Sequence, residues 1–208
     1  MSTPSHGALA QRLQGLSIYL VGMMGCGKSS VGAPLARALG YRFLDADGAL
    51  EQVAGRTIPE VFAREGEEGF RALETAVLAQ ITGWHSLVVA TGGGVVTRPE
   101  NWGHLRQGVV VWLDAPPDLL LARLARDPSP RPLLEAPDRE ARLEGLLEQR
   151  RPLYAQADLR VAQTGASPGQ VAEDVLRALP SILRERQAPP DQPARLRNEA
   201  GTSTPSLN

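Results

Sequence analysis

Residues 22–29 read GMMGCGKS and match the pattern G-x-x-x-x-G-K-[ST] of a phosphate-binding loop. The context fits the motif, because an apolar run at 18–21 precedes it and a helical pattern at 29–39 follows it. Glycines let successive backbone N–H groups curl around one anion, and the N-terminus of the next helix adds a positive end. The dinucleotide fingerprint G-x-G-x-x-G is absent, since the sixth residue from Gly25 is Ser30. The stretch therefore predicts a nucleotide-binding strand–loop–helix unit.

Individual residues of this loop have separate expected roles. Lys28 is predicted to reach the β- and γ-phosphates of a nucleoside triphosphate, and the Ser29 hydroxyl is predicted to ligate Mg²⁺. Lys28 is also the single lysine among 22 basic residues. The bias toward arginine thus stops at a position that needs a compact ammonium on a flexible stem. Cys26 is expected to be a small residue that fills the loop, with a redox role as the alternative.

Composition excludes several classes of protein. The chain has 208 residues, 42% of them hydrophobic, which is the size of one domain with a real core. A net charge of −1 argues against a general nucleic-acid or membrane-surface binder. One cysteine cannot form an intrachain disulfide, and no run of about 18 apolar residues occurs. We therefore expect a cytoplasmic protein that binds neither nucleic acid nor membrane. We also expect a monomer, although composition does not determine the oligomeric state.

Short apolar runs alternate with helical patterns along the chain. Beyond 18–21, such runs lie at 43–44, 87–90, 109–113 and 159–161. This alternation predicts an α/β protein, a three-layer α/β/α arrangement around a five-stranded parallel sheet. Helices are expected to begin at the capping box 57–60, and to cover 67–82, 138–154 and the stretch from Ser167 to about 183.

Both ends of the chain have the composition of tails. Residues 1–14 are mixed, and 184–208 contain few large apolar residues and no periodic pattern. We expect a folded domain at 15–183, preceded by an N-terminal tail and followed by a disordered C-terminal tail.

Polar and basic residues follow the expected strands at the edge where ligands bind in parallel sheets. Asp45 and Asp47 form D-x-D after the second strand; in an extended chain they share a face and suit a metal shell and a proton acceptor. Three glycines at 92–94 end the third strand and would expose backbone N–H groups to a small molecule. Arg131 lies in a proline-rich stretch, where an arginine on a mobile loop suits transferring phosphate charge.

Taken in order, these motifs resemble the shikimate kinase family. The resemblance covers about 16–183 and rests on GMMGCGKSS, FLDAD, FRALE, TGGGVV, RPLL and RRPLY. It implies the nucleoside-monophosphate-kinase-like P-loop fold, with a substrate-binding insert at about 45–75 and a lid at about 126–137. It also implies phosphorylation of the 3-hydroxyl of shikimate by ATP with Mg²⁺, a step in chorismate and aromatic amino-acid biosynthesis.

The resemblance assigns roles to matching residues. Asp45 would hold Mg²⁺ through water, and Asp47 would hold the shikimate hydroxyls and favour deprotonation of the attacking one. Arg71 and Arg150 would clamp the shikimate carboxylate, and the backbone of Gly93 would donate to a hydroxyl. The residues expected to hold the ATP phosphates are Gly25, Cys26, Gly27, Lys28, Ser29 and Ser30.

The expected lid carries further arginines. Arg131 would close over ATP, and either Arg123 or Arg126 would be a second lid arginine, because the spacing does not decide between them. Family members often place a polar or basic residue against the adenine just before the final helix, whereas this chain has Ala166 there.

Two other functions stay open at this point. Another small-metabolite P-loop kinase, such as a gluconate kinase, would share the loop but should lack the paired arginines of FRALE and RRPLY. A nucleotide-gated binding module would need neither those arginines nor an acceptor site.

Overall fold

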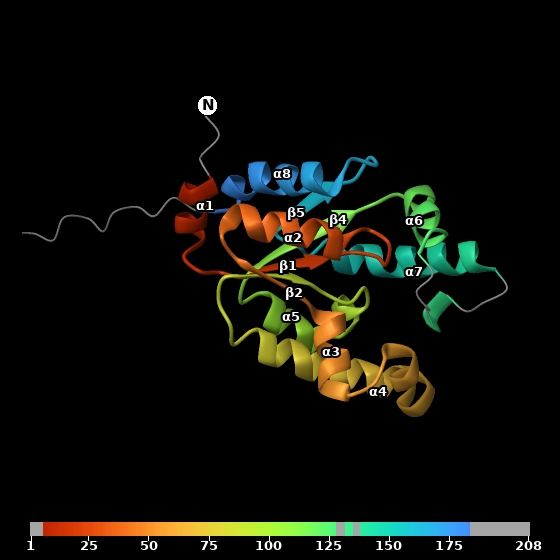
Figure 1. Ribbon diagram of the computed structural model, residues 1–208. Helices are drawn as coiled ribbons and strands as arrows, with labels where there is room; N and C mark the ends of the chain where they lie inside the picture. Colours follow the sequence, from red (N-terminus) through yellow and green to blue (C-terminus); the bar gives the residue numbers. More distant parts are fainter. Residues whose placement is uncertain (1–5, 128–131, 135–137, 184–208) are drawn as a thin grey trace, which may run out of the picture.

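The structure, a computed structural model, describes residues 6–127, 132–134 and 138–183 (Figure 1). Five strands form one sheet in the order β2-β3-β1-β4-β5, and every neighbouring pair is parallel. The predicted five-stranded parallel sheet is therefore confirmed. The strands are β1 (Ile18–Val21), β2 (Arg42–Asp45), β3 (Leu87–Ala90), β4 (Val109–Asp114) and β5 (Leu159–Ala162).

Helices cover both faces of the sheet, as the three-layer prediction requires. In Figure 1, α1, α2 and α8 lie on one face, α3, α4 and α5 lie on the other, and α6 lies beyond the carboxyl ends of the strands. α7 begins beyond these ends and runs back to the sheet, where Tyr154 in its last turn stacks on Trp112 of β4. The helices are α1 (His6–Leu13), α2 (Lys28–Leu39), α3 (Ala46–Ala54), α4 (Ile58–Ile81), α5 (Pro99–Leu105), α6 (Pro117–Leu124), α7 (Arg139–Tyr154) and α8 (Pro168–Ala178). Short 3₁₀ turns follow at Val95–Thr97, Pro132–Leu134 and Leu179–Ser181.

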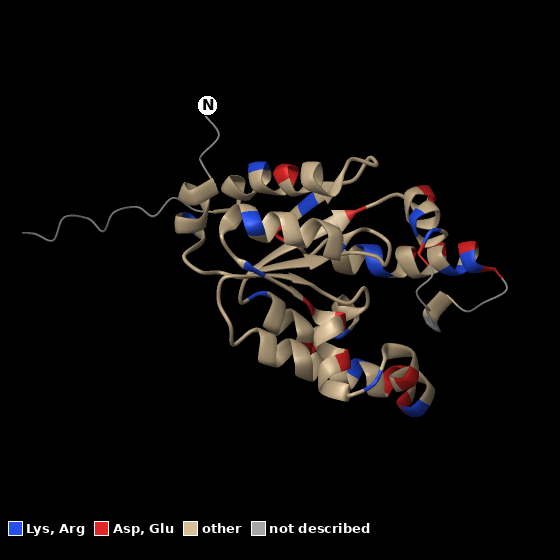
Figure 2. Ribbon diagram, viewed as in Figure 1, with Lys and Arg blue, Asp and Glu red and all other residues tan. Residues whose placement is uncertain are grey.

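The central strands are apolar on both sides because helices cover both sides. β1 (IYLV), β3 (LVVA) and β4 (VVVWLD) are buried along their whole length. Figure 2 shows charged residues on the helices, in loops, on the edge strands β2 and β5 and at the end of β4, and none on β1 or β3. The edge strand β2 is more exposed, and its Phe43 ring packs so closely on Gly32 of α2 that a Cβ there would clash. Gly32 thus lets α2, which follows the phosphate loop, lie directly on the sheet.

Local signals place the helix ends as predicted. α2 ends at Gly40, which has φ +69° and donates to the carbonyls of Ala36 and Arg37. At the start of α4, the side chains of Thr57 and Glu60 each accept from the other's backbone N–H, which completes a capping box. α4 is interrupted at Gly66, with φ +69°, so the helix predicted from residue 67 is its second segment.

The expected N-terminal tail is partly wrong. Residues 6–13 form α1, and Leu9 and Leu13, one turn apart on the same face, are buried against the core. Arg12 Nη2 also donates to the carbonyl of Leu183 at 2.8 Å, which ties α1 to the end of the described chain. Burial of its apolar face stabilises a helix that is too short to persist alone. The C-terminal tail, 184–208, lies outside the described residues.

None of the described helices is both long and apolar enough to cross a membrane. The segment 45–75, expected as a substrate-binding insert, forms α3 and most of α4. Of the expected lid at 126–137, the structure describes Arg126, Asp127 and 132–134, while Arg131 lies outside the described residues.

Candidate active site

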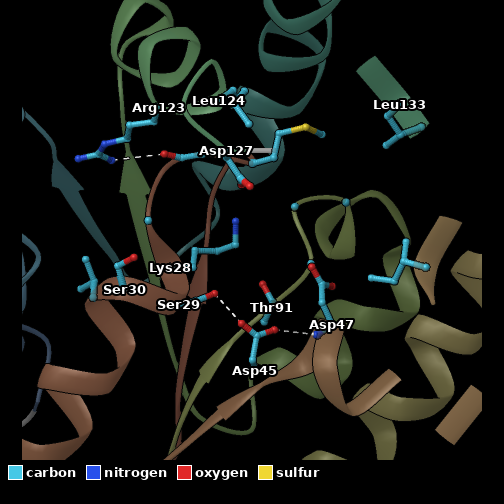
Figure 3. A pocket seen from close by; sticks show the side chains of 18 of the residues that line it. Lys28, Ser29, Ser30, Asp45, Asp47, Thr91, Arg123, Leu124, Asp127 and Leu133 are labelled. Carbon is cyan, nitrogen blue, oxygen red and sulfur yellow. Dashed lines mark hydrogen bonds between the residues drawn. The ribbon is translucent and has the colours of Figure 1, made fainter. Parts of the chain in front are cut away.

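A cavity of about 1020 Å³ lies at the carboxyl ends of the strands, where ligands bind in open parallel sheets (Figure 3). One end is lined by the phosphate loop and the other by α3, α4 and the glycines after β3. The predicted residues that line it are Gly25, Gly27, Lys28, Ser29, Ser30, Asp45, Asp47, Arg71, Gly93 and Arg150. The structure therefore brings together residues that are up to 125 positions apart in the chain, from Gly25 to Arg150.

Glycines with positive φ and hydrogen bonds from Lys28 determine the conformation of the phosphate loop. Gly25 and Gly27 have φ of +80° and +91°, a region that favours glycine. Lys28 is the first residue of α2, and its Nζ donates to the carbonyls of Gly22 at 2.8 Å and Met23 at 3.2 Å. Cys26 has no exposed surface, and its Sγ lies 3.8 Å from Lys28 Nζ. The Cys26 side chain thus packs beneath the loop and does not line the cavity.

Ser29 and Asp45 meet at the edge of the cavity. The Ser29 hydroxyl donates to Asp45 Oδ2 at 2.5 Å (Figure 3). The other Asp45 oxygen accepts from the backbone N–H groups of Asp47 at 3.0 Å and Gly48 at 3.4 Å, which caps α3. Asp47 therefore lies in the first turn of α3, and the expectation that both aspartates share one face of an extended strand is wrong. Both carboxylates still line the same cavity.

Arg71 is held by two carboxylates of its own helix. Its guanidinium donates to Glu74 at 2.8 Å and to Glu67 at 3.1 Å, and the side chains of Arg71 and Glu74 are each only 6% exposed. Burial alone would lower the pKa of Arg71, but the charge and hydrogen bond of Glu74 raise it above its ordinary value. Burial raises the pKa of Glu74 by more than the attraction of Arg71 lowers it, and the nearby Asp47 carboxylate raises it further. The pair is therefore a fixed cation beside a poorly solvated carboxyl.

Two of the three glycines after β3, Gly92 and Gly94, allow close packing. A Cβ on Gly92 would lie within 3.0 Å of Glu74 Oε1, and one on Gly94 would lie as close to the guanidinium of Arg71. Arg71 and Glu74 thus lie directly against this backbone, a reason for glycine that we did not predict. The Gly93 carbonyl accepts from Arg150 Nη1 at 3.3 Å and from the Tyr154 hydroxyl at 2.5 Å. Two residues of α7 thereby fix the backbone that the resemblance assigns to the substrate.

Tyr154 is fully buried under this backbone, and its ring stacks on Trp112 with centroids 5.9 Å apart. Burial raises the pKa of Tyr154 well above its ordinary value, so its hydroxyl stays a neutral donor.

Arg123 and Gln163 both line the cavity and contact the carbonyl of Cys26 in the phosphate loop. Arg123 Nη1 donates to the carbonyl of Cys26 at 3.1 Å and to Gln163 Oε1 at 3.0 Å. Figure 3 shows Arg123 reaching the loop from the α6 side. Arg126 does not line the cavity, so of the two arginines left open by the spacing only Arg123 lies at the site. Ala166 lines the cavity together with Pro168 and Val171, which form an apolar wall.

Sequence reasoning missed several residues of the cavity and its support. Glu74 and Tyr154 stand inside the quoted motifs FRALE and RRPLY, but no role was assigned to them. Gln163 directly follows β5 at the carboxyl edge, and that position could have singled it out. Asp127 also lines the cavity.

The family model of shikimate kinase matches residues 24–180. The shikimate kinase of Synechococcus sp. (strain RCC307) is 60% identical over 181 residues, which are 87% of this chain and 93% of the relative. The shikimate kinase of Gloeobacter violaceus (strain ATCC 29082 / PCC 7421) is 55% identical over 177 residues, 85% of this chain and 99% of the relative.

Comparison with solved structures also identifies shikimate kinases as similar proteins. Shikimate kinase from Acinetobacter baumannii in complex with shikimate superposes with a TM-score of 0.79 at 41% identity, covering 83% of this chain and 97% of that one. A gluconokinase from Sinorhizobium meliloti 1021 has a TM-score of 0.54 at 18% identity, covering 81% of this chain and 94% of that one, which shows a shared fold alone. With a family model over most of the domain and relatives above 50% identity over nearly their whole length, the chain belongs to the shikimate kinase family.

Proposed function

We propose that this chain transfers the γ-phosphoryl group of ATP to the 3-hydroxyl of shikimate, giving ADP and 3-phosphoshikimate. The observation that carries the proposal is one cavity joining the phosphate loop to two buried arginines, Arg71 and Arg150. Arginine suits a carboxylate because its planar fork donates two parallel hydrogen bonds. The match to the shikimate kinase family favours this acceptor over gluconate, because the likeness to the gluconokinase extends to the fold alone.

The phosphate loop would bind ATP through its backbone and Lys28. Lys28 Nζ, which donates to two loop carbonyls, would exchange one of these acceptors for phosphate oxygens. Its position at the first turn of α2 adds the positive end of the helix to its own charge. Arg131, expected on the lid and outside the described residues, would add charge over the transferred phosphoryl group.

The oxygens of Ser29 and Asp45 fit Mg²⁺. They are hard donors, they lie side by side at the phosphate end, and a magnesium ion bound with a nucleotide needs only one or two protein ligands. In this proposal Ser29 is a direct ligand and Asp45 acts through water. Bound Mg²⁺ would neutralise charge on the β- and γ-phosphates.

Asp47 would orient the attacking hydroxyl and accept its proton. It lies in the first turn of α3, next to the Ser29–Asp45 pair and facing the same cavity (Figure 3). Arg71 and Arg150 would hold the carboxylate at the far end, and the Gly93 N–H would donate to a second hydroxyl. Catalysis would then be mostly positioning and charge stabilisation.

We also propose that the chain acts as a monomer in the cytoplasm.

A coupled assay of ADP release tests the proposal. The purified chain is given MgATP with shikimate, with gluconate or with no acceptor, and Asp47→Asn purified in parallel controls for contaminating kinases. We expect rapid ADP release with shikimate alone, and little with the variant. Release with gluconate would support the other metabolite kinase, whereas equal release without any acceptor would support a nucleotide-gated module.

A further inference from the structure

We propose that Gln163 is a positioning residue for the phosphate loop, which it locks in the orientation that binds nucleotide. This inference rests on the proposed function only as far as the chain binds a nucleotide.

Gln163 is a buried polar residue that joins three parts of the fold. It follows β5 directly, it is 4% exposed, and its backbone N–H donates to the carbonyl of Asp114 at the end of β4. Its side-chain Nε2 donates to the carbonyl of Cys26 at 2.5 Å, and its Oε1 accepts from Arg123 of α6 at 3.0 Å. Gln163 therefore connects the sheet, through its backbone, to the phosphate loop and to the helix that leads to the expected lid, through its side chain.

The bond to the Cys26 carbonyl determines where the next N–H points. In a trans peptide the carbonyl and the following N–H point in opposite directions, so fixing the Cys26 carbonyl also fixes the N–H of Gly27. Gln163 and Arg123 both donate to the Cys26 carbonyl, and Gly27, whose N–H follows that carbonyl, lines the cavity. Gly27 has φ +91° and can rotate more freely than other residues, so an external restraint matters here. A loop with a fixed N–H loses less entropy when the phosphate binds.

A neutral amide can make both contacts, because it carries a donor and an acceptor. The nitrogen of Gln163 donates to the Cys26 carbonyl, and the oxygen accepts from Arg123. A carboxylate could still accept from Arg123 but could not donate to the carbonyl. A substitution can therefore remove the contact to Cys26 and keep the contact to Arg123.

Two variants test the inference, with ADP affinity from calorimetry and KM values for both substrates as readouts. Gln163→Met removes both contacts at nearly constant length, and Gln163→Glu removes the donor to Cys26 while adding a negative charge beside the phosphate loop. We expect each variant to weaken ADP binding and to raise the KM for ATP about tenfold, as for loss of one buried hydrogen bond. The KM for shikimate should stay within about twofold.

The matched control is Gln156→Met, which breaks an exposed amide–arginine contact between Gln156 and Arg106 and should change none of these constants. Unchanged ADP affinity in folded Gln163→Met, or an equal rise in both KM values, would overturn the inference. Wild-type ADP affinity in Gln163→Glu would also overturn it, since holding Arg123 would then be sufficient. If Gln163→Met does not fold, Gln163→Leu decides, since it also removes both contacts without adding charge. A wild-type chain that binds ADP but does not phosphorylate shikimate would contradict the proposed function, and the ADP affinities would still decide the role of Gln163.

Discussion

Replacing Arg71 by methionine should weaken both the fold and shikimate binding, by separate routes. The change strands the Glu74 carboxylate, whose partner is 2.8 Å away and whose side chain is 6% exposed. Removing one partner of a buried ion pair typically costs about 3–5 kcal/mol. The second contact, to Glu67, adds little because that side chain is 53% exposed. We therefore expect the free energy of unfolding to fall by about 3 kcal/mol or more.

The loss of stability in Arg71→Met should depend on pH in a defined direction. Arg71 lowers the pKa of Glu74, so its removal raises that pKa further above the ordinary value of 4.5. A carboxyl with a raised pKa binds its proton more tightly in the folded state than in the unfolded state. Stability then declines as the pH rises from about 4.5 through the folded pKa. The variant should lose less stability at pH 5 than at pH 8, and Arg71→Met/Glu74→Gln should restore much of the loss at pH 8.

Kinetic constants distinguish the effect on shikimate binding from the effect on stability. Both variants lack the cation that we assign to the shikimate carboxylate, so both should raise the KM for shikimate. A lost charged hydrogen bond of about 1.5–3 kcal/mol corresponds to roughly tenfold to over a hundredfold. The KM for ATP should stay nearly unchanged.

Urea unfolding at pH 5 and pH 8 and initial-rate kinetics measure these effects. Arg177→Met is the control, because Arg177 also pairs with a carboxylate three residues away, at 2.9 Å, but is 63% exposed. The reasoning is refuted if Arg71→Met costs no more stability than this control, or if both KM values rise together.

Four further predictions concern the phosphate end, Asp47 and the lid. Lys28→Arg should lower kcat by at least about 100-fold, because Lys28 Nζ lies in a tight buried setting beside the Gly22 carbonyl. An amine-reactive ATP analogue should label Lys28 unless MgATP is present; a labelled yet fully active enzyme would falsify the loop assignment. Asp47→Asn should lower kcat by about 10²–10⁴ with little change in the KM for ATP, and a rate near that of the wild type would exclude a proton-accepting role. The amides of Leu133 and Leu134 should gain hydrogen-exchange protection with nucleotide and shikimate together, and equal exchange with and without both ligands would contradict a closing lid.

Local sequence patterns predicted most of the fold. The limits of β1 and β3 follow from apolar runs that end at glycine or threonine, because a parallel strand covered on both faces must be apolar along its whole length. The N-terminal ends of α4 and α8 follow from capping residues that act within one turn. α1 was missed because eight residues give little periodic signal, and its burial depends on α2 and α8.

The sequence by itself determined the phosphate loop and the strand–loop–helix unit around it, because glycine geometry and the helix N-terminus act over a few neighbouring residues. It also singled out Arg71 and Arg150 as candidate site residues, through motifs rather than through contacts. Only the tertiary structure decided that Glu74 and the glycine backbone hold Arg71, and that Asp47 starts a helix instead of continuing a strand. The same is true of Gln163, which binds a carbonyl 137 residues away. Such partners are chosen by packing across the sheet, and no pattern of neighbouring residues encodes which distant polar groups will be buried together.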